Sequence, residues 1–253
     1  DFVLFRAKIL IEKKDYIHAV SLLDMYERQH VDSLEYYILR AKLPVPMFLA
    51  NDADAAALAE VIAGAAKDKE NAVLLTLGTG VGGGIVIGGE VVHGVHGAGG
   101  EIGHMQMRDD ETDVCGCGKR GCVEQYCSAT GIVRLAKRML AESGKPSALR
   151  ARETFTSKDI CDLAQQGEEM AAEIVDRFGE YLGRALSYVS CVVDPDVYIV
   201  GGGMSRAGSI VTDAVTGYYR KYAFHVSTAT PIVLAELGND AGIYGCAKMV
   251  LSA

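Results

Sequence analysis

The sequence has no apolar run of the roughly 18–20 residues that a bilayer-spanning helix needs. Residues 1–3 include no basic group leading into an apolar signal-peptide core. Basic residues are also scarce, because 25 Lys and Arg against 33 Asp and Glu leave a formal net charge of −8. The chain therefore lacks the positive field that draws proteins to nucleic acid or anionic lipid. We expect a cytoplasmic protein that binds neither membrane nor nucleic acid.

The cysteines do not form the pattern of a disulfide framework. Seven are present, an odd number, and three of them fall between positions 115 and 122. This distribution favours a reducing compartment and one metal cluster. The other four are expected to be core residues: Cys127, Cys161, Cys191 and Cys246.

Residues 1–42 differ in pattern from the remainder of the chain. Apolar residues recur there at three- and four-residue spacing and are interrupted by a polar stretch at 12–15, which predicts a helical hairpin. The segment resembles a single helical repeat, which cannot bury its apolar face alone and must pack on the rest of the chain or on a second copy. Alternatively, residues 1–42 only pack against the rest of the protein and take no part in its chemical function. Pro44 and Pro46 end this helical pattern.

The remainder alternates between strand and helix patterns. A short buried strand is expected at 47–50, ended by the pair Asn51-Asp52. The further expected strands are 72–77, 84–87, 196–200 and 231–237, and the expected helices are 53–66, 128–140, 168–193 and 239–251. This alternation predicts an α/β protein whose ligand lies at the carboxyl ends of the strands.

The strongest local signal is His104 followed by Cys115, Cys117 and Cys122. Three thiols within eight residues, separated by glycines, can supply three corners of a tetrahedron around Zn²⁺, with an imidazole as the fourth. A site filled by four protein ligands has no open position for water, so we expect a structural zinc. The alternative is a set of free thiols or a redox pair in a glycine-rich loop.

Two glycine-rich runs follow predicted strands. The run at 78–84 leads into a second strand and not into a helix, so it is neither a Rossmann fingerprint nor a Walker loop. Its successive amides could still cradle phosphate, with the Thr79 hydroxyl as a further donor, although a plain hairpin turn has the same appearance. The run at 201–203 would let a nucleoside approach the backbone, but a simple strand-to-helix connection also uses glycine.

Several carboxylates lie in or next to the predicted elements and motifs and are candidates for the functional site. Asp52 could accept the proton of an alcohol during phosphoryl transfer, or it could merely cap the helix that follows. Asp54 is expected to be an exposed residue that interacts with the helix dipole. Glu101 and Glu124 flank the metal motif and could bind sugar hydroxyls together with the second nitrogen of His104, or they could be solvated surface groups. The other histidines, His93 among them, are expected in loops or interfaces.

Six motifs, taken in order, resemble those of the ROK family of repressors and sugar kinases, within the actin-like ATPase superfamily. They are the Asn-Asp-Ala-Asp-Ala-Ala run at 51–56, where the family has Asn-Asp-Ala-Asn-Ala-Ala, the glycine run at 77–84, Glu-Ile-Gly-His at 101–104, the cysteine motif at 115–124, the glycines at 201–203 and the stretch 237–242. The resemblance covers about residues 42–253.

The resemblance implies a two-lobe α/β fold of the actin-like ATPase (ribonuclease H-like) type. It also implies that the protein phosphorylates a hexose or N-acetylhexosamine with ATP. In this fold, 43–70 would be the remnant of a small N-terminal lobe and 71–253 the large lobe. A homodimer or higher homo-oligomer is expected. The implied general base is Asp52, and the implied sugar ligands are Asn51, Glu101, His104 and Glu124. The implied zinc ligands are His104, Cys115, Cys117 and Cys122. The ATP phosphates, with Mg²⁺, would be bound by Gly78, Thr79, Gly80 and Gly82. The adenosine part of ATP would lie against Gly202 and Gly203.

One feature of the family pattern has no counterpart in residues 1–42. Family kinases begin with a strand and a glycine turn of the type Asp-x-Gly-Gly-Thr, which helps to hold phosphate and metal. Its absence predicts an incomplete N-terminal lobe and reduced activity, or a partner subunit that completes the lobe. The alternative function is a non-catalytic sugar-binding regulator.

Overall fold

The computed structural model describes residues 8–16, 18–19, 23 and 51–252, which fall in two compact units, 1–49 and 50–253. In the first unit, residues 8–12 and 18–19 are helical, and Lys14 adopts a left-handed conformation in the turn after the first of these segments. The rest of the expected hairpin and the strand expected at 47–50 lie outside the described residues.

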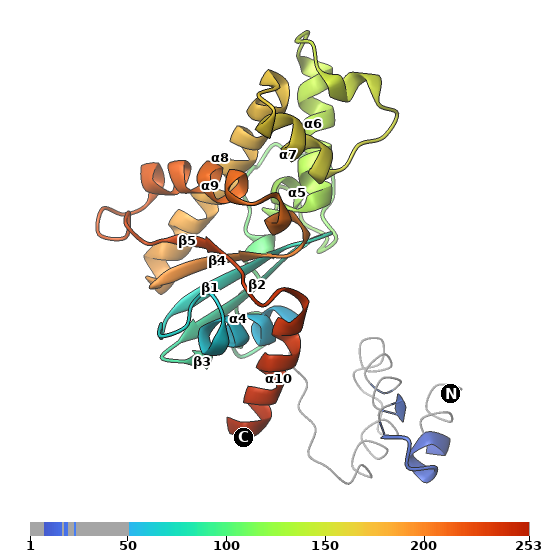
Figure 1. Cartoon of the computed structure of the whole chain (residues 1–253), viewed down its shortest axis with the longest axis vertical. Helices are drawn as coiled ribbons and strands as arrows, with labels where there is room; N and C mark the ends of the chain where they lie inside the picture. The colour runs from blue at the N-terminus through green and yellow to red at the C-terminus, as the bar shows by residue number, and fades with distance from the viewer. Residues whose placement is uncertain (1–7, 17, 20–22, 24–50, 253) are drawn as a thin grey trace. The chain divides into compact units, whose positions relative to one another are not determined.

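The second unit is organised around one mixed five-stranded sheet with strand order β3-β2-β1-β4-β5 (Figure 1). The central strand β1 pairs antiparallel with β2 and parallel with β4, and β4 pairs parallel with β5. The strands are β1 (Ala72–Leu77), β2 (Val81–Ile87), β3 (Glu90–Val91), β4 (Val197–Gly201) and β5 (Ile232–Leu234). Because β1 and β4 are parallel, their carboxyl ends meet at the same edge of the sheet.

Helices cover both faces of this sheet, as Figure 1 shows. On one face lie α4 (Asp52–Ala63) and α10 (Ala241–Ser252), and on the other lies the long α8 (Glu169–Val193), packed against α9 (Ser209–Tyr222). The other helices described in the second unit are α5 (Glu124–Cys127), α6 (Ala129–Glu142), α7 (Ser157–Gln165) and the short 3₁₀ turns Ile102–His104, Ala148–Ala151, Gly203–Ala207 and Gly238–Asp240. The predicted α/β architecture is confirmed, whereas α7 and α9 were not predicted.

Successive residues of β1 supply two hydrophobic cores. Val73, Leu75 and Leu77 pack into the larger core with α5, α6, α8 and α9, while Ala72 and Leu74 pack into the smaller core beneath α4. This follows from the two-residue period of a strand, which directs neighbouring side chains to opposite faces. Burial on both faces explains why the strand is a nearly continuous apolar run.

Helix α4 lies directly on β2 because glycine allows the close approach. A Cβ atom on Gly84 would lie 2.5 Å from the carbonyl oxygen of Ala53. Gly245 of α10 approaches α4 in the same way, since a Cβ there would lie 1.8 Å from the carbonyl oxygen of Ala55. The structure groups α4 with the strands in the unit that begins at residue 50. The assignment of 43–70 to the remnant of a small lobe stays a prediction.

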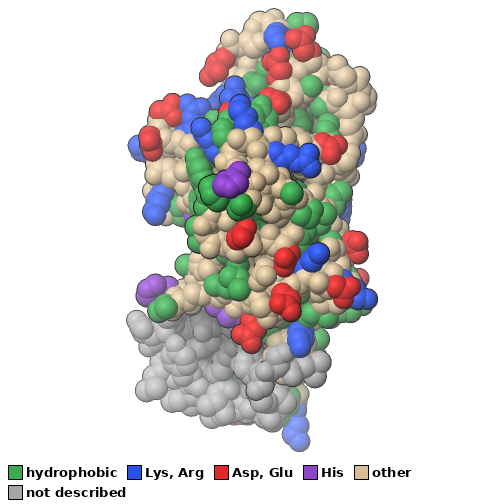
Figure 2. All heavy atoms as spheres, turned by 90° about the vertical axis from the view of Figure 1, so that its left-hand side faces the viewer, with side chains coloured by type: hydrophobic (Ala, Val, Ile, Leu, Met, Phe, Trp, Pro, Cys, Tyr) green, Lys and Arg blue, Asp and Glu red, His purple; other side chains and the backbone are tan. Residues whose placement is uncertain are grey.

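The surface carries charges of both signs. Figure 2 shows acidic and basic side chains interspersed on the face it presents, and some of the described ones form ion pairs, such as Arg177 with Glu180. Within the described part of the chain, we find no helix with the length and apolar character needed to cross a membrane.

The prediction that four cysteines belong to the core is half wrong. Cys127 and Cys161 are buried, but Cys191 and Cys246 are exposed. Residue type gives only an average tendency toward burial. On α8 and α10, the position of each cysteine around the helix decides its exposure.

Candidate functional site

Asn51, and not Asp52, caps helix α4. The Asn51 Oδ1 atom accepts hydrogen bonds from the backbone N–H groups of Ala53 at 2.8 Å and Asp54 at 3.4 Å. The interpretation of Asp52 as the capping residue is therefore wrong, because the preceding asparagine already satisfies these donors. Asp52 is exposed in the first helical turn, where its Oδ1 accepts a bond from the Ala53 N–H at 2.9 Å.

Asp52 lines a pocket of about 670 Å³ at the carboxyl edge of the sheet. Gly202 and Gly203, which follow β4, line the same pocket, as does Thr76 of β1. The loop and helix start at 238–242 close another side. The structure thus brings Asp52 together with the glycines expected on the adenosine side.

A second feature of the site is the turn 78–80, which is held against the start of α6. The carbonyl oxygen of Gly78 accepts a bond from the Ala129 N–H at 2.8 Å, and that of Thr79 accepts one from the Thr130 hydroxyl at 2.7 Å. The turn ends earlier than the glycine run predicts, because β2 already begins at Val81. Glycine is a weak strand signal, so only the pairing with β1 reveals this start.

Gly82 lies within β2 and not in the turn. It pairs with Thr76 of β1, and a Cβ at Gly82 would lie 2.6 Å from the Thr76 hydroxyl oxygen and 3.4 Å from the Cβ of Ala53. The start of β2 is therefore next to the start of α4. This close approach places the turn 78–80 near the helix that carries Asp52.

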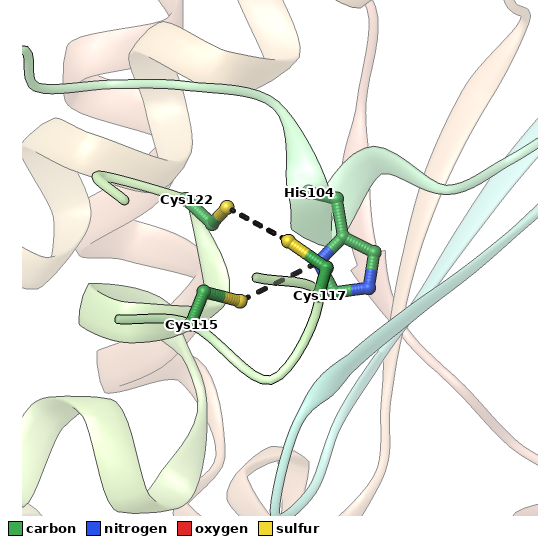
Figure 3. Close-up of side chains that lie close together, drawn as sticks. All are labelled: His104, Cys115, Cys117 and Cys122. Atoms are coloured by element: carbon green, nitrogen blue, oxygen red, sulfur yellow. Dashed lines mark hydrogen bonds between the residues drawn. The ribbon is translucent and has the colours of Figure 1, made fainter. Parts of the chain in front are cut away.

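The expected metal ligands are brought together. One ligand atom from each of His104, Cys115, Cys117 and Cys122 lies within 4.8 Å of the other three. Figure 3 shows the four side chains directed toward one another. The Cys117 and Cys122 sulfurs are 3.6 Å apart, and the Cys115 sulfur is 3.7 Å from His104 Nδ1. Zn–S bonds of about 2.3 Å in a tetrahedron place two sulfurs about 3.8 Å apart. The donor set and its spacing therefore fit a tetrahedral zinc ion.

Backbone turns and hydrogen bonds shape this cysteine loop. Gly118 and Gly121 have φ values of 84° and 76°, a left-handed region that glycine adopts without strain. Burial raises the pKa of the Cys115 thiol, and its contact with Glu124 raises that pKa further. The backbone N–H of Lys119 lowers the pKa of the Cys117 thiol.

A network that the sequence analysis missed braces the cysteine loop from outside. The Gln125 side chain accepts a bond from the Cys122 N–H at 3.0 Å and donates one to the Asp113 carbonyl at 3.0 Å. The buried carboxylate of Glu111 is bound by both terminal nitrogens of Arg138, at 2.6 and 2.7 Å, and by the Tyr126 hydroxyl at 2.6 Å. The Arg138 guanidinium holds the pKa of Glu111 well below its usual range. No sequence motif marks these contacts, since they join residues from a loop and two helices.

Two glutamates lie beside the metal cluster. His104 directs Nδ1 toward Cys115, while its Nε2 lies 3.7 Å from Glu101 Oε2. Glu124 lies 3.0 Å from the Cys115 sulfur through Oε1 and accepts a bond from the Val81 N–H at 3.3 Å through Oε2. One imidazole nitrogen therefore faces the cluster, and the other faces a carboxylate.

The predicted site residues are divided between two pockets. Asp52, Gly202 and Gly203 line the first, and Thr79, Gly80 and Glu124 line the second, which has a volume of about 370 Å³. Cys115 also lines the second pocket. The turn 78–80 and the metal cluster thus share one cavity, with Glu124 between them.

Asp54 departs from its expected place on the surface. It is only 4% exposed, and its Oδ2 lies 2.9 Å from His93 Nδ1. Burial raises the pKa of its carboxyl, although the His93 contact opposes that rise. The expectation of an exposed residue is wrong, because the Asp54 side chain is buried and bonded to His93 of the segment after β3. The Asp in place of the family's Asn was the one signal in the sequence that could have drawn attention to it.

Comparisons with known proteins extend the resemblance. The model of the ROK family matches residues 10–253, so the limit near residue 42 that the motifs indicated is wrong. The glucokinase of Halalkalibacterium halodurans is 38% identical over 212 residues, which are 82% of this chain and 64% of that protein. The chain therefore spans less than two thirds of the length of that relative.

Solved structures show the same architecture. A ROK family glucokinase from Streptomyces griseus, in complex with glucose and AMPPNP, is 31% identical and superimposes with a TM-score of 0.74 over 85% of this chain and 71% of that one. A ROK family transcriptional regulator, described as a homologue of the Escherichia coli MLC protein, is 33% identical with a TM-score of 0.72 over 84% of this chain and 53% of that one. The predicted actin-like α/β fold is confirmed, and the chain belongs to the ROK family.

Proposed function

We propose that this protein transfers the terminal phosphoryl group of ATP to a hydroxyl of a hexose or N-acetylhexosamine. The observation that carries the proposal is the position of Asp52. Asp52 is not the capping residue of α4, since Asn51 is, and it lines the same pocket as Gly202 and Gly203. Phosphoryl transfer needs little more from a protein than a carboxylate near the alcohol and groups that position the phosphates.

In the proposed reaction, Asp52 accepts the proton of the sugar hydroxyl while the hydroxyl oxygen bonds to the terminal phosphorus of ATP. The bond between that phosphorus and the oxygen of the leaving ADP breaks. Asn51, Glu101, Glu124 and Nε2 of His104 hydrogen-bond the other hydroxyls and hold the reacting one toward Asp52. Gly78, Thr79, Gly80 and Gly82 receive the phosphates, and Gly202 and Gly203 lie along the nucleoside. Mg²⁺, when bound with ATP, neutralises phosphate charge.

We assign the cluster of His104, Cys115, Cys117 and Cys122 to a structural zinc. Its four protein ligands leave no coordination position for water. The contribution of the site is therefore to fix His104 and the cysteine loop beside Glu124. Because this kinase needs ATP, the proposal includes a cytoplasmic location. It also includes assembly as a homo-oligomer, which the mass in solution tests.

We further propose that residues 1–253, assayed by themselves, have reduced activity. These residues contain no Asp-x-Gly-Gly-Thr motif, so they supply one set of phosphate donors fewer than a ROK kinase that has this turn. Each preorganised donor to a developing charge contributes on the order of 10²–10³ in rate. We expect turnover at least that much slower than that of a ROK kinase that has this turn.

The experiment is an assay of ADP formation by the purified chain with Mg-ATP and a panel of hexoses and N-acetylhexosamines. Asp52→Asn should abolish ADP formation, because the amide cannot accept the proton. Asp213→Asn on the exposed side of α9 is the matched control and should leave the rate unchanged. If none of the sugars stimulates ADP formation, the kinase proposal is wrong.

A second function is favoured by one observation, the similarity to a ROK transcriptional regulator. In that case the chain binds a sugar without phosphorylating it. Calorimetry separates the two functions, since heat of sugar binding without ADP formation supports the regulator. The acidic charge of the chain argues against a direct role in binding DNA.

A further inference from the structure

The segment 92–100 connects β3 to Glu101, a residue of the proposed sugar site. Most of its side chains are exposed, and Val95 at its tip is 97% exposed. Within the described part of the chain, the backbone contacts that join it to other elements lie at its ends. Val92 donates to the Ile85 carbonyl at 2.8 Å, and Gly100 lies so close to Gly83 that a Cβ on Gly83 would be 2.2 Å from the Gly100 carbonyl oxygen.

One side chain ties this segment to another element. His93 Nδ1 lies 2.9 Å from Oδ2 of Asp54, in the first turn of α4. Among the described residues, this is the only hydrogen bond that a side chain of segment 92–100 makes. The Asp54 side chain is 6% exposed and that of His93 is 57% exposed, so the bond reaches from the surface into a buried position.

The buried partner in this bond, Asp54, has other carboxylates near it. Asp54 Oδ1 is buried and has no partner within the described part of the structure. Glu101 and Asp52 are both close enough to disfavour the ionised form of Asp54, and His93 opposes them. A buried carboxylate without a hydrogen-bond partner raises the free energy of the folded state, so the hydrogen bond from His93 stabilises the protein.

The two residues also join the two sides of the proposed site. Asp54 is two residues from Asp52 on α4, and His93 lies near the start of segment 92–100, which leads to Glu101. Glu101 in turn faces His104 Nε2. The chain from His93 to Glu101, in which the Gly99 N–H donates to the His93 carbonyl at 2.9 Å, therefore links the helix of the proposed general base to the proposed sugar ligands.

We propose that Asp54 and His93 form a latch, a pair of positioning residues that holds segment 92–100 on α4 and so sets Glu101 relative to Asp52. This inference rests on the proposed function for its effect on sugar binding, but the latch itself is a property of the free protein. Neither residue touches the reacting atoms. The carboxylate of Asp54 acts through His93, and His93 acts through the backbone that leads to Glu101.

The first test measures hydrogen exchange of the amides in residues 94–100, with no ligand present. His93→Ala and Asp54→Ala should each speed this exchange about tenfold, because a hydrogen bond to a charged group is lost. Asp54→Asn should remain near the wild-type rate, since its amide oxygen can accept the same bond from His93. His96→Ala is the matched control, as His96 is exposed on the same segment. Equal exchange in His93→Ala and His96→Ala would overturn the inference.

The second test measures the KM for sugar and for ATP, together with the sugar Kd by calorimetry. His93→Ala should raise the sugar KM and Kd about tenfold while the KM for ATP changes less than twofold. Asp54→Asn should restore the sugar affinity that Asp54→Ala loses, which a general loss of stability would not do. An equal change in both KM values would contradict the positioning role.

The two proposals fail in different ways. If the wild-type chain neither binds nor phosphorylates sugar, but hydrogen exchange responds as expected to His93→Ala, the proposed function is wrong and the latch stands. If sugar is bound and exchange is the same in every variant, the latch is wrong and the proposed function stands. A double-variant cycle of His93→Ala and Asp54→Ala, each of which removes the hydrogen bond, measures the coupling between the two side chains directly.

Discussion

The Oε2 atom of Glu124 accepts a hydrogen bond from the backbone N–H of Val81 at 3.3 Å. This bond connects the end of the turn 78–80 to the helix that follows the cysteine loop. The other carboxylate oxygen of Glu124 lies 3.0 Å from the Cys115 sulfur. One side chain therefore spans the proposed phosphate turn and the proposed zinc site, so that a shift in either should move the other.

The first prediction concerns this bridge. A Cβ on Gly80 would lie 2.7 Å from Glu124 Oε2, so Gly80→Ala should displace the carboxylate. We expect a several-fold higher KM for sugar and an unchanged zinc content. Gly116→Ala is the control, because a Cβ there meets nothing within 4 Å. Similar kinetic effects of the two substitutions would contradict the bridge.

The second prediction concerns the metal. The purified chain should contain about one zinc ion, and removal of the ion by a strong chelator should lower the melting temperature, because a metal that binds only the folded state stabilises it. Cys117→Ser should lose zinc and melt at a lower temperature. Cys246→Ser, which changes an exposed cysteine outside the cluster, should do neither. Elemental analysis and thermal unfolding provide the measurements, and a zinc-free wild-type protein would count against the site.

The third prediction concerns the packing of α8 on α9. A Cβ on Gly183 would lie 2.7 Å from the backbone carbonyl of Val215, so Gly183→Ala should destabilise the fold by about 1–3 kcal/mol through overpacking. Gly217→Ala lies in α9, where a Cβ meets nothing within 4 Å, and should stabilise the fold by up to about 1 kcal/mol through helix propensity. Urea unfolding of both variants checks the opposite signs. The same sign for both would show that the two helices are not in such close contact.

The fourth prediction concerns acid stability. Arg138 lowers the pKa of Glu111 in the folded state, so the folded protein binds the proton less readily than the unfolded chain does. The stabilisation is fully present above the unfolded pKa of about 4.3 and is lost as the pH falls through the lower folded pKa. We expect Glu111→Gln to be less stable at pH 7 and to lose less stability between pH 5 and pH 3. The exposed Glu153→Gln should follow the wild-type curve, and parallel curves for all three proteins would argue against the linkage.

Local patterns in the sequence predicted the central elements well. The apolar run 72–77 is β1 with the same bounds, and the helix expected over 168–193 is α8. Both signals are strong because β1 is buried on its two faces and α8 has a long amphipathic pattern. The start of β2 was missed because Gly82 and Gly83 lack side chains that favour a strand. Helices α7 and α9 were not predicted, although Thr156 and Asp159 form a capping box at the start of α7.

Tertiary contacts explain the errors at the site. Asn51 and Asp52 are both good capping residues, and only the backbone at the start of α4 decides that Asn51 accepts the N–H groups. Asp54 looks like a surface residue until His93, distant in sequence, is placed against it. Gln125 and Glu111 brace the cysteine loop through partners that no short motif contains.

The sequence by itself determined the types and order of the groups in the site, namely three thiols and an imidazole at metal-ligand spacing, the Asn-Asp pair and the glycine runs after strands. Those features are local, because ligand chemistry and turn conformation depend on a few neighbouring residues. Only the tertiary structure decided that Asp52 is free of the cap, that Glu124 joins the turn to the metal cluster, and that Asp54 is buried against His93. Each of these depends on burial and on contacts between distant segments, which the packing of α4 and the cysteine loop on the sheet creates.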